Sequence, residues 1–158
     1  RTVLTVSPNP ENDALAKVRA MWEAAGSIVD IMEPAYHDRG LAATSHLPHL
    51  IAYTTMHALA DLGETIPDEV FRLAAGAGFR DFTRIASSDP AMWRDISLQN
   101  RDALLEFLDM FQEQLSDLRH RVDEGDADGL YGAFTRSKKA RDRILVVEGL
   151  QGKKIDHE

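Results

Sequence analysis

The sequence predicts a mainly α-helical fold, a helical bundle preceded by a short β-α-β piece. Three observations lead to this prediction. Residues 1–32 carry strand, helix and strand signals in turn, strand signals vanish from Glu33 on, and apolar residues between Leu104 and Val122 repeat at heptad spacing. A chain of 158 residues suits one domain, or one domain with a fragment of another.

The β-α-β piece begins with Thr2–Val6, whose β-branched and apolar residues predict a short buried strand. Apolar residues at helical spacing follow (Leu15, Val18, Trp22 and Ala25), and Gly26 ends that helix. Ser27–Met32 predicts a second strand, and the connection is long enough for a parallel crossover. The loop Ser7–Pro10 has no glycine, so it cannot cradle a pyrophosphate as a G-x-G-x-x-G loop does.

A long helical pattern runs from Pro34 to Asp61, interrupted only by Pro48. A proline inside a helix removes one backbone hydrogen bond, so we expect a kink near His46–His49. Gly63 should end the helix, and Pro67 should open a short one that runs through Leu73.

The second half of the chain carries four further predicted helices. The first follows a Gly76–Gly78 turn, has Phe79 and Phe82 on one face, and contains Arg84. Asp89 and Pro90 form an N-cap and N1 pair for the next helix. The heptad seam then comprises Leu104, Leu108, Phe111, Leu115, Leu118 and Val122, and a tight turn at Gly125–Gly129 leads to a last helix from about Leu130 to Val147.

Composition excludes several classes of protein. A net charge of −8 argues against nucleic-acid binding, which depends on neutralising phosphates. No apolar run approaches the length of a membrane span, and no signal peptide is visible. Cysteine is absent, which removes disulfides and thiolate metal sites. We therefore expect a cytoplasmic protein that binds neither nucleic acid nor membrane.

His46 and His49 are the first candidates for a polar site, because a helix places residues three apart on neighbouring positions of one flank. A metal site is disfavoured, since no carboxylate has matching spacing and His57 lies too far along the helix axis. The plain alternative is a pair of helix histidines hydrogen-bonded to their neighbours. Their position on either side of Pro48, after Ser45, favours a polar pocket.

Arg84 is the strongest single candidate, because a guanidinium held on a helix can bind a carboxylate through two parallel hydrogen bonds. The alternative is a structural ion pair with Asp81, three residues earlier. Trp93 has the neighbours of a core residue, Met92 and Ile96, and core is the commoner fate of a tryptophan.

The segments Ser45–His49 and Gly78–Asp95 together resemble the C-terminal helical domain of prephenate dehydrogenases, nicotinamide-dependent enzymes of tyrosine biosynthesis. The resemblance extends from about Thr2 to Ile144. It implies that His49 and Arg84 bind substrate, and that His46, Asp81 and Trp93 bind it or support those that do. The chain departs from the family's Gly-Gly-Gly run with Ala77, which puts contacts from that loop in doubt.

The resemblance also implies a domain division: 1–32 as the end of a Rossmann-like nucleotide-binding domain, 33–150 as a helical dimerisation and substrate-binding domain, and 151–158 as a tail. The family's glycine-rich loop and catalytic histidine would precede Arg1, so this chain is expected to hold no catalytic, cofactor-binding or metal-binding residue. The expected activity is oxidative decarboxylation of prephenate with NAD or NADP, in a homodimer, with tyrosine as a candidate inhibitor. Two alternatives stay open: an arogenate or cyclohexadienyl dehydrogenase, and a non-catalytic dimerisation and tyrosine-sensing module.

Overall fold

The computed structural model describes residues 1–6, 12–62 and 66–147 and divides into two compact units, Arg1–Asp109 and the residues from Met110 on. Three predicted features lie outside the described residues: the Ser7–Pro10 loop, the helix end at Gly63 and the tail 151–158. The predicted domain boundaries after residues 32 and 150 stay predictions.

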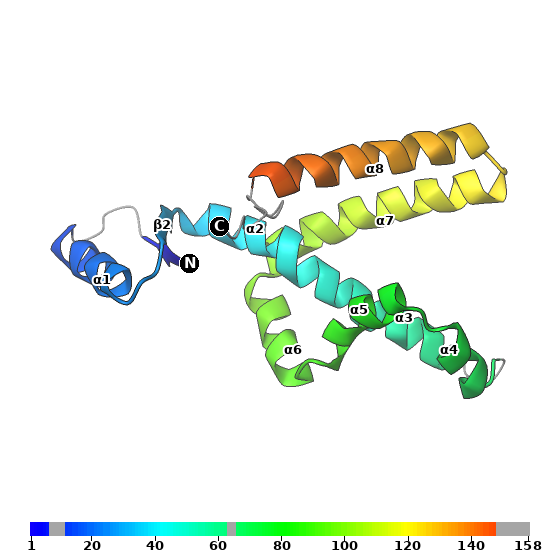
Figure 1. Cartoon of the computed structure of the whole chain (residues 1–158), viewed down its shortest axis with the longest axis horizontal. Helices are drawn as coiled ribbons and strands as arrows, with labels where there is room; N and C mark the ends of the chain where they lie inside the picture. Colours follow the sequence, from blue (N-terminus) through cyan, green and yellow to red (C-terminus); the bar gives the residue numbers. More distant parts are fainter. Residues whose placement is uncertain (7–11, 63–65, 148–158) are drawn as a thin grey trace, which may run out of the picture. The chain divides into compact units, whose positions relative to one another are not determined.

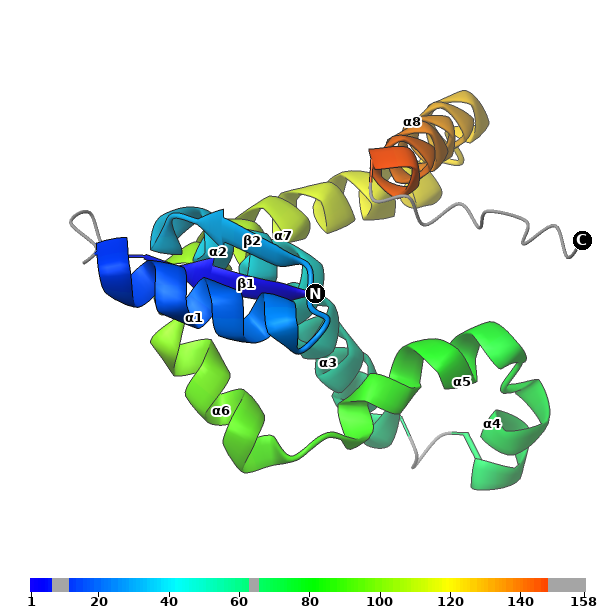
Figure 2. The same ribbon diagram turned by 60° about the vertical axis from the view of Figure 1, so that its left-hand side comes forward.

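The β-α-β piece forms as predicted, but its first strand is half-exposed instead of buried, with Val3 40% exposed. β1 (Thr2–Thr5) pairs in parallel with β2 (Val29–Met32), and α1 (Asn12–Ala24) connects them (Figures 1 and 2). Gly26 ends α1 with φ of +84°, the left-handed conformation that glycine adopts most easily. Ser27 N–H donates to Trp22 O and Gly26 N–H to Glu23 O, which satisfies the last carbonyls of the helix.

The long helix predicted from Pro34 to Asp61 contains a π-helical turn. It consists of α2 (Pro34–Leu41), the π-helical segment η1 (Ala42–His46) and α3 (Leu47–Asp61). Leu47 N–H donates to Ala42 O, a bond one residue longer than in an α-helix. The irregularity therefore lies just before Pro48, which has no N–H to donate. The helix is therefore irregular near the predicted kink, and the irregularity is a π turn that ends at His46.

Three short elements follow α3, and one prediction about them is wrong. Gly76 is the N-cap of α5 (Ala77–Thr83), so Ala77 and Gly78 belong to a helix instead of a turn. Arg84 lies in a helical stretch as predicted, at the residue where α5 passes directly into the 3₁₀ segment η2 (Arg84–Ser87). A side chain at Gly76 or Gly78 would meet no atom within 4 Å. α4 (Asp68–Ala74) precedes α5, close to its predicted place after Pro67.

The predicted cap at Asp89 is confirmed, because its Oδ1 accepts hydrogen bonds from Ala91 N–H (2.7 Å) and Met92 N–H (3.0 Å) at the start of α6 (Pro90–Gln99). Asn100 then joins α6 to α7 (Arg101–Asp123). Within the described residues, the hydrophobic core consists of Ala42, Ala52, Trp93 and Leu104, with His46 as the one buried polar side chain. The core of the first unit therefore surrounds the π turn.

The second unit contains the end of α7 and all of α8 (Ala127–Val147), joined by a turn at Gly125, whose φ is +64° (Figure 1). α8 begins three residues earlier than predicted, so the turn is shorter than Gly125–Gly129. The predicted heptad seam is only partly covered, since Leu115 is 53% exposed and Val122 is 63% exposed. Across the described ranges, no helix has the length and apolar character needed to cross a membrane.

Candidate functional site

Three of the five candidate residues lie together at the π turn of the first unit. The His49 ring stacks on the Trp93 ring with centroids 3.7 Å apart and planes 19° apart. The His46 ring meets Trp93 edge to face, at 6.1 Å and 78°. Trp93 comes from α6, and the two histidines come from the end of η1 and the first turn of α3. The extra residue of the π turn helps to place both imidazoles around one indole.

Trp93 is a core residue and also a wall of this site. Its side chain is only 7% exposed, and its Nε1 is the one buried side-chain nitrogen or oxygen in the described part of the chain that lacks a hydrogen-bond partner. An unpaired buried donor is costly, so Trp93 is held in place by packing rather than by polar contacts.

His46 is 8% exposed and is contacted by a residue that the sequence did not indicate. The side-chain nitrogen Nδ2 of Asn100 lies 3.2 Å from His46 Nδ1 and also donates to Asp38 O at 2.8 Å. Burial lowers the pKa of His46, and the charges of His49 and His37 lower it further, while Asp38 acts in the opposite direction. His46 is thereby favoured as a neutral imidazole.

His49 is half-buried, and its Nδ1 lies 2.8 Å from Ser45 O. A carbonyl oxygen can only accept, so His49 Nδ1 carries a proton and donates it. One turn further along α3, the Tyr53 hydroxyl donates to Ser88 O at 2.6 Å. This bond ties Ser88, the residue that follows η2, to α3, the helix that carries His49.

The Arg84 and Asp81 side chains lie free on the surface of the first unit. Both side chains are exposed, and no hydrogen bond or ion pair joins them to each other or to any other residue of the described ranges. The Asp81–Arg84 ion pair, which the sequence left open as the alternative role of Arg84, is therefore not formed, although the Arg84 backbone is helical and its N–H donates to Arg80 O.

Three contacts around the site were not predicted from sequence. Asn100 reaches His46 across 54 positions, and Tyr53 reaches Ser88 across 35. Arg39 binds both carboxylate oxygens of Glu106, and the Arg39 guanidinium lies 5.6 Å from the Phe107 ring centroid. The only local signal for Asn100 was its position between two predicted helices. Within the described residues, no three acidic, histidine or cysteine side chains gather in a group that could hold a metal ion.

Comparison with known proteins identifies the family. Residues 33–136 match the family described as prephenate dehydrogenase, dimerization domain. The chain belongs to the prephenate dehydrogenase family. It is 39% identical over 139 residues to the cyclohexadienyl dehydrogenase of Zymomonas mobilis, covering 88% of this chain and 47% of that protein. It is 36% identical over 142 residues to the prephenate dehydrogenase of Bacillus subtilis, covering 90% of this chain and 38% of that protein.

Solved structures of the prephenate dehydrogenase family have the same fold. The Aquifex aeolicus prephenate dehydrogenase, in complex with hydroxyphenyl propionate and NAD⁺, superposes with a TM-score of 0.79 at 33% identity over 90% of this chain and 49% of that one. The Synechocystis arogenate dehydrogenase gives a TM-score of 0.77 at 26% identity, over 90% of this chain and 51% of that one. This chain therefore spans about half the length of these relatives, or less.

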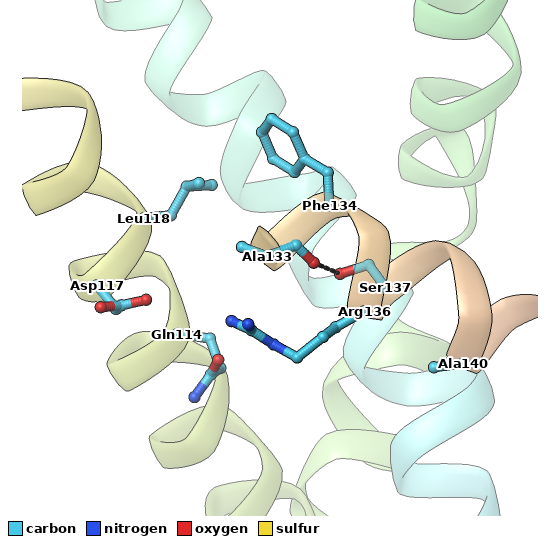
Figure 3. A pocket seen from close by; sticks show the side chains of 8 residues that line it. All are labelled: Gln114, Asp117, Leu118, Ala133, Phe134, Arg136, Ser137 and Ala140. Atoms are coloured by element: carbon cyan, nitrogen blue, oxygen red, sulfur yellow. Dashed lines mark hydrogen bonds between the residues drawn. The ribbon is translucent and has the colours of Figure 1, made fainter. Parts of the chain in front are cut away.

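The family match includes part of the α7–α8 hairpin, which contains a hollow of about 370 Å³. Residues of both helices line it: Gln114, Asp117, Leu118, Ala133, Phe134, Arg136, Ser137 and Ala140. Arg136 extends from α8 toward α7, and Phe134 borders the same hollow (Figure 3). The hollow mixes apolar and charged residues.

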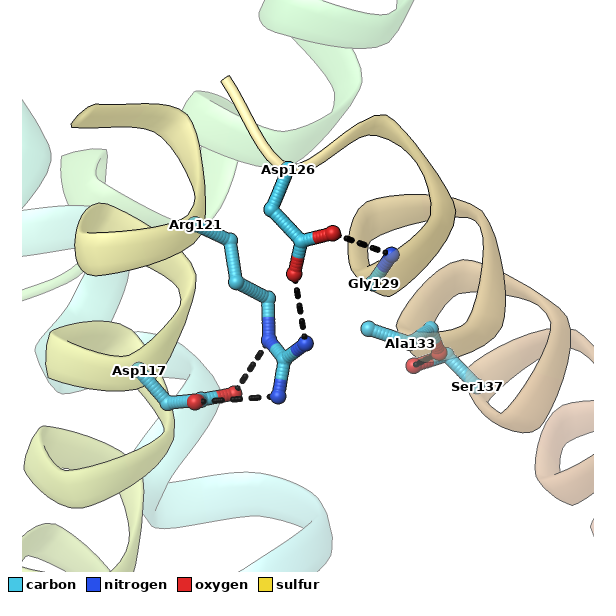
Figure 4. A network of polar contacts seen from close by, with 6 residues as sticks. All are labelled: Asp117, Arg121, Asp126, Gly129, Ala133 and Ser137. Atoms are coloured by element: carbon cyan, nitrogen blue, oxygen red, sulfur yellow. Dashed lines mark hydrogen bonds and ion pairs between the residues drawn. The ribbon is translucent and has the colours of Figure 1, made fainter. Parts of the chain in front are cut away.

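An ionic network fixes the turn between α7 and α8 of this chain (Figure 4). Arg121 Nε and Nη2 bind the two carboxylate oxygens of Asp117 at 2.8 and 3.1 Å, and Arg121 Nη1 binds Asp126 at 3.3 Å. Asp126 also accepts from Gly129 N–H at 2.9 Å, which caps α8. The hydrogen bonds from Arg121 hold the pKa of Asp117 below its usual value.

Proposed function

We propose that this chain is the substrate-binding and dimerising part of a prephenate dehydrogenase. The reaction would be the oxidative decarboxylation of prephenate to 4-hydroxyphenylpyruvate, in which a hydride passes to a nicotinamide cofactor. One observation carries the proposal, namely that the candidate residues gather around α3. The His46 and His49 rings both contact Trp93. The segment that begins with Arg84 is joined to α3 by the Tyr53–Ser88 hydrogen bond. The likeness to the Aquifex enzyme with hydroxyphenyl propionate supports a ligand of this class.

Arg84 is proposed to bind a substrate carboxylate. Prephenate carries two carboxylates, and a guanidinium can bind one of them through two parallel hydrogen bonds. The Arg84 side chain is exposed and has no partner among the described residues, so it needs to break no ion pair before it binds. His49 would contribute a second polar contact through Nε2, because its Nδ1 is already occupied by Ser45 O. Asp81 is proposed only to shape the local charge.

The nicotinamide cofactor is proposed to bind elsewhere in the full enzyme. A phosphate cradle usually needs a glycine-rich turn that opens a helix. In the part of the chain that the structure describes, the glycines with positive φ are Gly26 and Gly125, and both end a helix. These residues do not fit a dinucleotide, and no step of the reaction is assigned to them. NAD is favoured over NADP by the NAD⁺ bound to the Aquifex relative.

The helical part is proposed to form a homodimer, in keeping with the family's description. The described residues bury few hydrophobic side chains, while several large ones on α7 and α8 are exposed: Leu115, Val122, Tyr131, Phe134 and Ile144. Exposed apolar side chains, where they gather into a patch, mark protein interfaces in soluble proteins. A second copy of the chain would cover it. We also propose a cytoplasmic location, as expected for this biosynthetic step.

Arogenate is the alternative substrate, since the Zymomonas relative is a cyclohexadienyl dehydrogenase and the Synechocystis relative an arogenate dehydrogenase. Control by tyrosine belongs to the same proposal, because tyrosine shares the phenyl ring and carboxylate of the product. The non-catalytic module that senses tyrosine stays as a rival function for the 158-residue chain alone.

The proposal is tested with an enzyme in which this chain follows a nucleotide-binding domain of the family. Prephenate and arogenate are each supplied with NAD and with NADP, and formation of the reduced nicotinamide is followed by absorbance. We expect turnover of prephenate with NAD, and none by the 158-residue chain alone, because its sequence has no G-x-G-x-x-G loop. Turnover by the chain alone would contradict the proposed division of labour, and an inactive fused enzyme that binds tyrosine would favour the sensing module.

A further inference from the structure

His46 and His49 carry their protons on different ring nitrogens. A side-chain NH₂ group has two hydrogens and no acceptor. Asn100 donates one to Asp38 O, and that carbonyl fixes the orientation of the amide. The second hydrogen points to His46 Nδ1, which must then accept and carry no proton. His49 is the reverse, because its Nδ1 donates to Ser45 O.

The second nitrogen of each imidazole is open to a ligand. In the described part of the chain, Trp93 Nε1 is the one buried side-chain nitrogen or oxygen without a partner. Neither His46 Nε2 nor His49 Nε2 has a partner there, so both atoms must reach solvent. A neutral His46 therefore presents an N–H donor at Nε2, whereas a neutral His49 presents a lone pair.

The surroundings keep His46 in this form. The groups that face it are Asp38, His37 and His49, with the Trp93 ring edge to face. The Asp38 carboxylate, the one group that favours a charged His46, is itself 2.9 Å from His37 Nδ1. Burial and the two neighbouring histidines act in the opposite direction. Protonation at Nδ1 would also bring a new N–H against the NH₂ of Asn100.

We propose that Asn100 is a positioning residue of the substrate site, which holds His46 as a neutral imidazole so that His46 Nε2–H donates to an oxygen of a carboxylate-bearing ligand. This inference rests on the function proposed above. Asn100 does not touch the ligand, and its effect passes through the proton position on His46. His49 then supplies the complementary nitrogen, so the pair can distinguish an acceptor from a donor on the bound molecule.

The proton position is measured directly by ¹⁵N NMR of the histidine side chains in the 158-residue chain at neutral pH, with no ligand present. We expect His46 to carry its proton on Nε2 and to be neutral, and Asn100→Ala to abolish that preference. A His46 that is charged, or that carries its proton on Nδ1, would overturn the inference. This readout is independent of whether prephenate is the substrate.

The role in binding is tested in the fused enzyme by comparing Asn100→Ala with Asn100→Asp. Asn100→Ala should raise KM about tenfold with kcat little changed, the effect of losing one hydrogen bond to a charged group. In Asn100→Asp, the carboxylate accepts from Nδ1–H and favours a charged His46, which still donates from Nε2. We therefore expect Asn100→Asp to recover most of the KM.

If Asn100 had only a structural role, the two variants would not differ in KM. Neither alanine nor aspartate can donate to Asp38 O, so both variants would then be equally impaired. Gln99→Ala is the matched control, an exposed neighbour on α6 that should leave KM unchanged. Equal impairment of the two Asn100 variants would reject the inference, whereas a fused enzyme that does not turn over prephenate would reject only the proposed function.

Discussion

The His49 and Trp93 rings stack with their centroids 3.7 Å apart, and this contact joins α3 to α6. The two residues are 44 positions apart in the sequence. The stack orients the imidazole while leaving its Nε2 without a protein partner among the described residues. The same indole meets the edge of His46. Trp93 therefore serves packing and ligand binding together, and the two roles can be separated by substitution.

Trp93→Ala should lower the free energy of unfolding by about 3–5 kcal/mol, as expected when a buried aromatic side chain is removed. Trp93→Phe should cost clearly less, because Nε1 makes no hydrogen bond that the phenyl ring would lose. Urea denaturation of the chain measures both values. Trp22→Phe is the control, since Trp22 is 39% exposed. Equal losses for the two Trp93 variants would mean that Nε1 has a partner after all.

Local patterns predicted local structure well. The cap at Asp89, the glycine end of α1 and the parallel β-α-β piece each depend on a few neighbouring residues, and each was found in place. Pro48 located the irregular turn but could not specify its type, because a π turn depends on how the rest of the helix packs.

Long-range contacts were beyond sequence patterns. Asn100 and His46 are 54 positions apart, and neither residue predicts the other. The helical spacing of Phe79 and Phe82 predicted a helix that contains Arg84, but it could not show that the helix changes from α to 3₁₀ at this residue. The Tyr53–Ser88 bond, which links residues 35 positions apart, ties the end of this stretch to α3.

The free energy of unfolding should fall as the pH drops from 6.5. Burial lowers the pKa of His46 from its ordinary 6.5, so between the two values the unfolded chain binds a proton that the folded chain does not. The stabilisation is complete above pH 6.5 and is lost progressively toward the folded pKa. Urea midpoints measured across this range, for the chain and for His46→Gln, should show a weaker dependence in the variant.

His57→Gln is the control for this pH experiment, because His57 is 82% exposed on α3. It should leave the pH dependence of the parent chain intact. A His46→Gln chain with the full parental dependence would show that other groups titrate in this range.

The homodimer should depend on the exposed apolar residues of α7 and α8. Leu115→Glu places a charge where a partner's apolar surface is expected, so the chain should become monomeric at micromolar concentration. Permanent dimers usually bury roughly 2,000 Å² or more, so the parent chain should remain dimeric on dilution. Sedimentation velocity distinguishes the two states. Gln112→Glu adds the same charge at an exposed polar position of α7 and should remain dimeric.

Arg84→Ala in the fused enzyme should raise the KM for prephenate about tenfold to a hundredfold, because the substrate carboxylate loses a charge-assisted pair. Arg84→Lys should recover only part of that loss, since an ammonium cannot form two parallel hydrogen bonds. The affinity for NAD should barely change. Folding stability should also be unaffected, because the Arg84 side chain has no hydrogen bond or ion pair among the residues the structure describes.

Steady-state kinetics and a melting curve, taken on the same preparations, distinguish a role of Arg84 in substrate binding from a role in folding stability. Arg94→Ala is the matched control, because Arg94 is exposed on α6 and its ion pair is to the adjacent Asp95 at 2.8 Å. That variant should keep the parental KM and melting temperature. An Arg84→Ala enzyme that melts early but binds prephenate normally would assign Arg84 to the scaffold, and one with unchanged stability and a raised KM would assign it to the substrate site.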